Sequence, residues 1–269
     1  TVLVVTSLSL VCAIDEPVCE GEACAAQPPP SPTGTPNKVK VFAVMRNGHE
    51  GIRGALATAK EAAETCAAQP NAETAAALRA AWDDVLTSID IHMRVEDQIF
   101  FKVLDDQFEN VVTNEGLRNE HIVDVNMQGG VTASIDAVVT LPSTETAAAA
   151  TSALDNFVTH HLEHLTHEEE VMMPLAKKIE PAKSRPGIVN SILTLDFDAY
   201  LKFLAINVRE VANRNKFGVL RMLCLAVQRC LTPSQYARVI PIIQQEAADV
   251  WEKLVAEGID KPGKFVSAN

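Results

Sequence analysis

Histidine is the residue type whose placement in this sequence points to chemistry. All seven histidines lie within residues 49–167 of a 269-residue chain, and two of them stand four positions before a glutamate. These pairs are His92 with Glu96 and His164 with Glu168. A spacing of four residues places both side chains on one face of a helix, one turn apart. Each pair can therefore offer an imidazole nitrogen and a carboxylate oxygen to the same metal ion.

Four long amphipathic helices joined by short connections are predicted to carry these residues. Capping residues, Asn71 and Ser143, stand at the starts of two of them, and Gly129-Gly130 predicts a kink or break in the third. Short connections between long helices make neighbouring helices antiparallel. The predicted fold class is therefore all-α, with an up-down-up-down four-helix bundle over residues 38–182. The predicted helices span about 38–68, 71–108, 114–141 and 143–178.

The lengths of the two predicted hairpins test whether the ligand-type side chains meet. In the first hairpin, His49 lies 19 residues before the turn and His92 lies 21 residues after it. In the second, His121 lies 20 residues before the turn and His164 lies 21 residues after it. Across the middle connection, Glu96 and His121 differ by five residues, roughly 7–8 Å at about 1.5 Å per residue. All four helices therefore bring such a side chain to one layer.

Polar groups gathered in the apolar interior of a bundle are very costly when they have no partners. A metal centre removes that cost. Four imidazoles and two carboxylates suit iron, manganese or zinc, and they suit two ions better than one. The predicted metal ligands are His49, His92, Glu96, His121, His164 and Glu168.

This arrangement resembles the hemerythrin family, also called the HHE cation-binding domain. One motif is Asn-Gly-His-Glu-Gly-Ile-Arg around His49, and another is His-Met-Arg-Val-Glu-Asp-Gln-Ile-Phe-Phe over residues 92–101. The remaining motifs are Glu120-His121 and the segment 164–174, which ends in Met-Met-Pro. The resemblance extends over about 39–178, roughly half of the chain.

The resemblance implies a non-haem di-iron centre with an oxo or hydroxo bridge and dioxygen, peroxide or nitric oxide as the small ligand. Each iron takes two imidazoles, and both glutamates bridge. The implied iron ligands are His49 with His92 and His121 with His164, bridged by Glu96 and Glu168.

The sequence departs from the oxygen-carrying hemerythrins at two places. On the third helix, those proteins have a second histidine four residues after the first, whereas this chain has Val125 four residues after His121. On the fourth helix, they have His-x4-Asp, whereas this chain has His-x3-Glu. The variant is similar to domains that sense iron or oxygen or handle reactive small molecules, rather than to reversible oxygen carriers.

Four further polar residues are assigned by their position on the helices. His160, one turn before His164, is the candidate for the missing imidazole, and Asp124 is the candidate to orient an imidazole. His161 and His167 are expected to face solvent or to contact the ligating side chains.

Two other functions are consistent with these residues. One is a di-iron oxidase or peroxidase-type enzyme, for which the sequence indicates no substrate channel and no proton donor. The other is a helical interaction module in which the metal is structural.

The composition narrows the choice of partner and compartment. With 23 basic and 35 acidic residues, the formal net charge is −12, which argues against binding to a nucleic-acid backbone. The apolar run 2–13 is too short to span a bilayer and is similar to a secretory signal, and a proline-rich tether completes residues 1–37. We therefore expect entry into the secretory pathway; the alternative is an apolar arm on a cytoplasmic or organellar protein.

The C-terminal part of the chain, 187–269, is predicted to be helical and to carry no site of its own. No histidine occurs after position 167, and Cys224 and Cys230 fall in helical patterns typical of small core residues. We expect these helices to pack on the bundle; the alternative is a subunit interface that makes a homo-oligomer. The predicted helices span about 188–213, 216–231 and 233–257.

Overall fold

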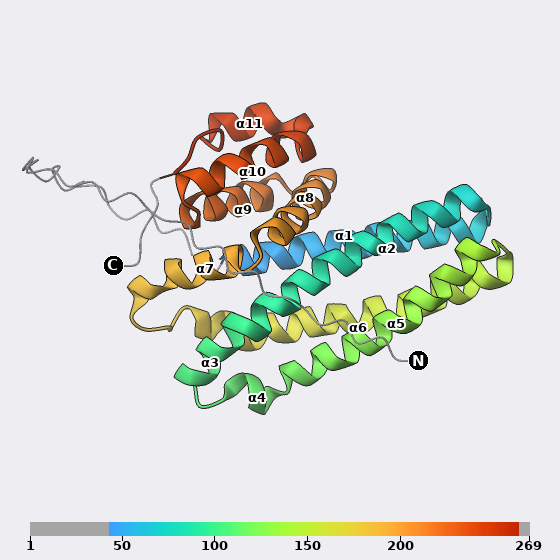
Figure 1. Ribbon diagram of the computed structural model, residues 1–269, viewed down its shortest axis with the longest axis horizontal. Helices are drawn as coiled ribbons and strands as arrows, with labels where there is room; N and C mark the ends of the chain where they lie inside the picture. Colours follow the sequence, from blue (N-terminus) through green and yellow to red (C-terminus); the bar gives the residue numbers. More distant parts are fainter. Residues whose placement is uncertain (1–42, 264–269) are drawn as a thin grey trace, which may run out of the picture. The chain divides into compact units, whose positions relative to one another are not determined.

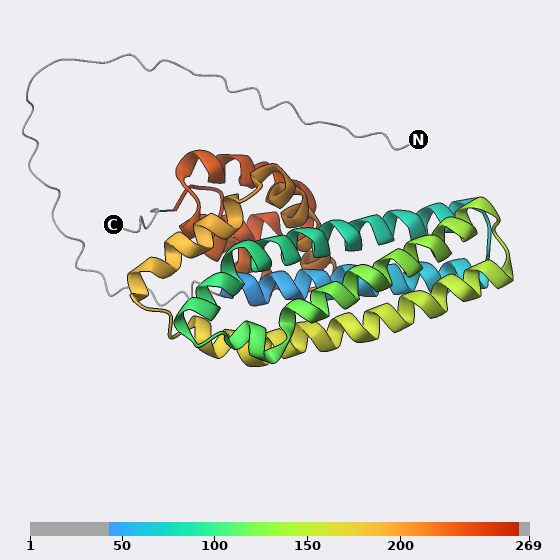
Figure 2. The same cartoon turned by 60° about the horizontal axis from the view of Figure 1, so that its bottom comes forward.

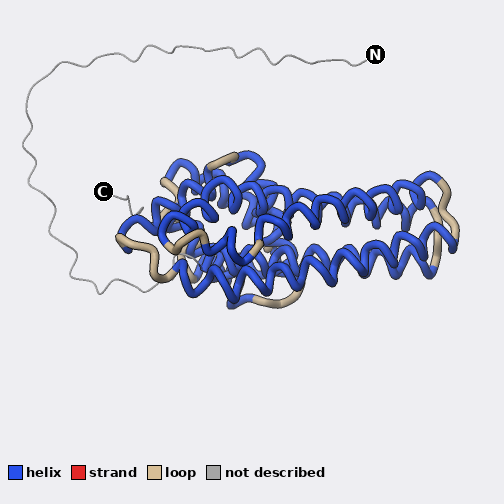
Figure 3. Tube along the Cα trace, turned by 90° about the horizontal axis from the view of Figure 1, so that it is seen from below, coloured by secondary structure: helices blue, strands red, loops and turns tan. Residues whose placement is uncertain are grey.

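The computed structural model describes residues 43–263, and every regular element within this range is a helix (Figures 1 and 3). The predicted all-α class is confirmed for these residues. The signal-like segment and the proline-rich tether over 1–37 lie outside the described residues. None of the described helices combines the length and the apolar character that crossing a bilayer requires.

Four long helices form a ring in which each packs on two others. α1 packs on α2 and α6, and α5 packs on the same two helices (Figures 1 and 2). Asn71 caps α2 by accepting hydrogen bonds from two backbone N–H groups, and Ser143 caps α6 in the same way through Thr146 N–H. The bounds are α1 Ala43–Ala68, α2 Ala72–Val95, η1 Glu96–Phe100, α3 Phe101–Gln107, α4 Val111–Glu115, α5 Leu117–Thr140 and α6 Thr144–Ala176.

Two predicted features of the bundle differ in the structure. The second helix does not run uniformly to position 108, because the five-residue π-helix η1 follows α2 before α3 begins. The third helix, α5, continues without a break through Gly129 and Gly130. A Cβ at either glycine would meet nothing within 4 Å, so no neighbouring group forces the backbone to bend there.

The remaining helices pack on α1 and α2, chiefly through α8 and α9 (Figure 1). Over 188–213, where the sequence predicts one helix, the structure has two helices. The break occurs because Asp196 leaves helical geometry and caps α8 by accepting from Ala199 N–H. The helix predicted over 233–257 ends at Glu246, and two short elements follow. The bounds are η2 Ala182–Ser184, α7 Arg185–Thr194, α8 Phe197–Asn213, α9 Phe217–Cys230, α10 Pro233–Glu246, η3 Ala248–Val250 and α11 Trp251–Ala256.

A row of glycines on α1 explains how closely α8 approaches. Gly48, Gly51 and Gly54 recur every three residues and therefore share one face of the helix. A Cβ at Gly51 would overlap Asn207, and one at Gly54 would come within 2.6 Å of the Glu210 Cβ. Only glycine leaves room for α8 at this distance.

Two apolar clusters fill the interior. One lies among α1, α2, α5 and α6 and includes Trp82 and Phe157, whose rings meet edge to face at 5.3 Å. The other joins the opposite part of the bundle, including Phe100 and Met172, to the C-terminal helices. Along the chain, His92 and His164 each lie between residues of the first cluster and residues of the second. Apolar side chains therefore pack on both sides of the layer that contains these two histidines.

Candidate metal centre

The six predicted ligand side chains come together in the bundle and are withdrawn from solvent. None is more than 4% exposed, and both glutamates are fully buried. They come from all four long helices and from η1, which begins at Glu96. The contributions are His49 from α1, His92 from α2, Glu96 from η1, His121 from α5, and His164 and Glu168 from α6.

The two carboxylate oxygens of Glu168 face different pairs of imidazoles. Its Oε2 lies 3.6 Å from His49 Nε2 and 3.3 Å from His92 Nε2. Its Oε1 lies 3.5 Å from His121 Nε2 and 3.1 Å from His164 Nε2. One carboxylate thus stands between two pairs of nitrogens, as a carboxylate that bridges two metal ions would.

Glu96 makes a second link between the two sides of the cluster. Its Oε2 lies 3.2 Å from His92 Nε2 and 3.6 Å from His121 Nε2. The ligand-type atoms form two overlapping groups, each with its atoms within 4.8 Å of one another. The groups are His92, His121, His164 and Glu168, and His49, His92, Glu96 and Glu168. Because His92 and Glu168 belong to both groups, the two candidate positions for a metal ion have these two side chains in common.

The inward-facing atoms of this cluster have no hydrogen-bond partners among the described residues. This holds for the Nε2 atoms of all four imidazoles and for both carboxylate oxygens of Glu96 and of Glu168. A buried polar group without a partner costs about 1–3 kcal/mol, and more when it is charged. Metal ions fit this arrangement, because they would satisfy nitrogen and oxygen atoms together.

Acidic side chains lie behind three of the imidazoles, with a hydrogen bond to the outer nitrogen of His49 and of His164 and a longer contact at His121. His49 Nδ1 lies 3.0 Å from Glu169 Oε1, His164 Nδ1 lies 2.7 Å from Glu120 Oε2, and His121 Nδ1 lies 3.3 Å from Asp97 Oδ2. A carboxylate on the outer nitrogen turns the other nitrogen toward the metal and makes it a stronger ligand.

These three orienting carboxylates were not predicted from the sequence, although a signal was present. Glu169 directly follows Glu168, Asp97 directly follows Glu96, and Glu120 directly precedes His121. Each acidic residue is therefore the chain neighbour of one ligand-type residue and contacts a histidine of another element. Glu169 of α6 contacts α1, Asp97 of η1 contacts α5, and Glu120 of α5 contacts α6.

A family comparison bears directly on this geometry. The family model of the hemerythrin HHE cation binding domain matches residues 40–176, about half of the chain, and this range contains the whole cluster. The chain belongs to the hemerythrin HHE family. No curated protein and no solved structure matches it. A buried His/Glu cluster inside an HHE domain fits a metal-binding hemerythrin-like protein.

The buried groups of the HHE cluster have strongly shifted pKa values, and the shifts differ between residues. Although burial opposes it, contacts with neighbouring carboxylates raise the pKa of His121 to about 12 and that of His164 to about 9. These two imidazoles must therefore release a proton before they bind a metal ion. Burial lowers the pKa of His92 to about 3, so this imidazole stays neutral and keeps the lone pair of one ring nitrogen available for a cation. Burial and the neighbouring Glu168 charge raise the pKa of Glu96, whereas histidines on several sides outweigh burial and lower the pKa of Glu168. Two adjacent buried carboxylates ionise together only when positive charge accompanies them.

The other three histidines of the HHE domain differ in their exposure. His160, the candidate for an extra imidazole, is 30% exposed, and its Nε2 lies 3.5 Å from Asp124 Oδ1. His161 does not face solvent, because its side chain is fully buried. It donates from Nδ1 to Asp124 Oδ2 at 2.8 Å. Its Nε2 has no hydrogen-bond partner among the described residues. His167 is partly exposed and donates to Glu120 Oε1 at 2.8 Å.

Proposed function

We propose that this hemerythrin-like protein holds two iron ions in an up-down-up-down bundle and binds or senses dioxygen or a related small ligand. The observation that carries the proposal is the position of Glu168, whose two oxygens face His49 and His92 on one side and two further imidazoles on the other. Such a carboxylate is suited to bridge a pair of ions.

The residues that would hold the ions follow from the same distances. His49 and His92 serve one position, and His121 and His164 serve the other, with Glu96 as the second bridging carboxylate. Manganese or zinc would suit the same donors. When bound, the two ions would supply coordination and redox chemistry; the chain holds them, orients the imidazoles and excludes bulk water.

His161 is the best candidate for the imidazole that the oxygen-carrying hemerythrins have on the third helix. Its ring packs 5.5 Å from the His164 ring and 6.4 Å from the His92 ring, measured between centroids. Its outer nitrogen is held by Asp124, as the outer nitrogens of ligating histidines are held by carboxylates.

Metal analysis after anaerobic loading with ferrous iron tests the proposal. We expect about two iron ions per chain, and an optical spectrum that changes on exposure to oxygen. His49→Ala and His121→Ala should each lower the iron content, whereas the control Glu170→Gln, an exposed carboxylate on α6, should leave it unchanged. Less than one transition-metal ion per chain in the wild-type protein would refute the proposal.

A further inference from the structure

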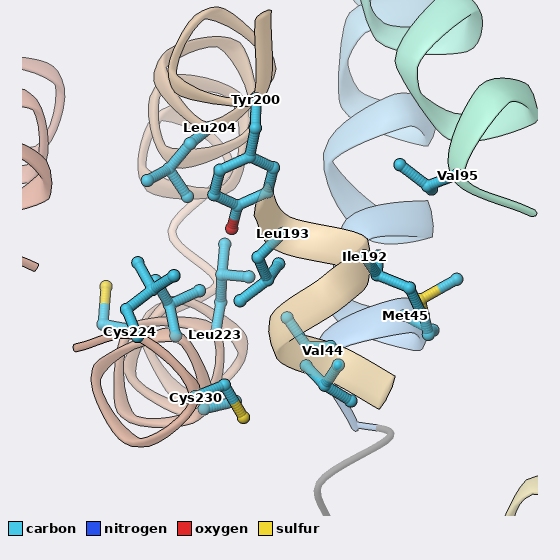
Figure 4. Packing of buried hydrophobic residues seen from close by; sticks show 14 of the residues in the cluster. Val44, Met45, Val95, Ile192, Leu193, Tyr200, Leu204, Leu223, Cys224 and Cys230 are labelled. Atoms are coloured by element: carbon cyan, nitrogen blue, oxygen red, sulfur yellow. The ribbon is translucent and has the colours of Figure 1, made fainter. Parts of the chain in front are cut away.

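An apolar cavity adjoins the candidate metal centre on the side of the C-terminal helices. It has a volume of about 40 Å³ and is lined from α1, α2, α7, α8 and α9. His92 and Tyr200 are the lining residues with polar side-chain atoms. Figure 4 shows Tyr200 and Leu193 pointing toward Leu223, with Ile192 beside Met45. The cavity therefore lies between the HHE bundle and helices that the family match does not cover.

His92 links this cavity to the candidate metal centre. Its Nε2 faces Glu96 and Glu168, while the ring also lines the cavity. The other three imidazoles of the cluster each have a carboxylate within 3.3 Å of Nδ1, but His92 Nδ1 has no such partner among the described residues. The side of the His92 ring that faces away from Glu96 and Glu168 therefore has apolar neighbours in place of an acidic side chain.

A second, smaller cavity adjoins the first. It has a volume of about 10 Å³ and shares Ile91, Val95, Ile192 and Tyr200 with the first cavity. Arg94 and Asp196 line its outer end, and Arg94 Nη1 lies 3.3 Å from Asp196 Oδ2 with both side chains partly exposed. The shared lining residues place the two cavities side by side, one lined by the ion pair and the other by the ring of His92.

We propose that the two cavities together form a passage that admits and holds a small uncharged diatomic molecule, such as dioxygen or nitric oxide, next to the metal centre. This inference rests on the proposed function. A site of roughly 10–15 Å³ on this measure suffices for one water molecule, and cavities with apolar walls remain dry and take up apolar gases. The volume of about 40 Å³ exceeds this requirement and accommodates a diatomic molecule. An anion would find no cation in the inner cavity.

The proposal gives the C-terminal helices a role beyond packing. Ile192, Leu193, Tyr200, Phe203 and Leu223 form the wall opposite α1 and α2. Gly48 lies on the α1 side of the cavity, where its missing side chain preserves space beside Phe203. Without these helices, the apolar face behind His92 would be open to water.

Xenon binding tests the cavity without any metal. The metal-free full-length protein is studied under xenon pressure, by crystallography or by ¹²⁹Xe NMR, and we expect xenon between Val95, Ile192 and Leu223. Val95→Phe, which extends a side chain into the passage, should abolish this signal. Ile192→Ala, which enlarges the space, should retain or strengthen it, so the test does not depend on one variant folding.

The rate of nitric oxide binding to the iron-loaded protein tests the passage. We expect Val95→Phe to slow it about tenfold, equivalent to about 1.4 kcal/mol in the barrier, with iron content unchanged. Ile192→Ala should not slow it. Absence of xenon from this position, or an unchanged nitric oxide rate in a folded Val95→Phe, would overturn the inference. Failure to bind iron would refute the proposed function alone, because the xenon result would still decide whether the cavity takes up gas.

Discussion

Gly51 of α1 lies so close to Asn207 of α8 that a Cβ on Gly51 would overlap the Asn207 side chain. Asn207 is fully buried there and donates from Nδ2 to the Phe203 carbonyl at 2.8 Å. Because His49 is two residues from Gly51, this contact anchors the C-terminal helices to the helix that supplies one of the candidate ligands.

Gly51→Ala should destabilise the protein by about 1–3 kcal/mol, because α8 must move away or Asn207 must change rotamer. The free energy of unfolding in urea measures this effect. Gly129→Ala is the matched control: it is also within a long helix, but its Cβ meets nothing, so we expect stabilisation by about 0.5–1 kcal/mol. Equal effects of the two substitutions would contradict the close packing of α1 and α8.

Ferrous iron should raise the thermal stability of the protein, because it binds the folded cluster and satisfies its partnerless nitrogen and oxygen atoms. At free iron near 100 times its dissociation constant, the gain is about 2.7 kcal/mol. Differential scanning calorimetry under anaerobic conditions measures the shift. Glu168→Gln should abolish most of it, whereas Glu170→Gln, an exposed neighbour on the same helix, should preserve it.

Glu120→Gln should weaken metal binding about 10- to 100-fold, because the carboxylate that accepts from His164 Nδ1 at 2.7 Å is lost. Competition with a chelator of known affinity measures the change. Glu163→Gln removes an exposed carboxylate from α6 and should have no effect. Identical affinities for the two variants would show that Glu120 does not support the metal site.

His161→Ala should alter the optical spectrum of the iron-loaded protein, because a buried imidazole beside the centre is removed. His160→Ala, which removes the neighbouring and partly exposed imidazole, should leave the spectrum unchanged. Comparing the two spectra at equal iron content isolates the ligand effect. The reverse result would assign the extra imidazole to His160.

The thiols of Cys224 and Cys230 should remain protonated in the folded protein well above pH 9, because burial raises the pKa of each to about 12. The unfolded chain loses these protons near the ordinary pKa of 9.0, so their contribution to stability is complete below pH 9 and declines as the pH rises toward 12.

Urea unfolding at pH 8 and pH 10 measures that decline, which should reach about 1.4 kcal/mol per pH unit for each thiol. The double variant Cys224→Ala/Cys230→Ala should show a smaller decline than the wild type. If the two proteins lose stability equally between these pH values, the thiols do not titrate as the fold requires.

The amino-acid sequence by itself determined the all-α class, the family and the set of six side chains able to meet. Helical rise and hairpin length fix the height of a residue along a bundle, so His49, His92, His121 and His164 could be placed in one layer from numbering alone. The short spacing between His164 and Glu168 likewise fixes a shared helix face.

Only the tertiary structure decided which way neighbouring side chains turn and what surrounds them. Successive residues point about 100° apart around a helix, so the choice between His160 and His161 depends on how α6 is rotated against α5. The contacts of the carboxylates behind the imidazoles also depend on how the helices pack, because each carboxylate and its histidine belong to different elements. The cavity behind His92 depends on packing between segments more than 90 residues apart, which no local pattern records.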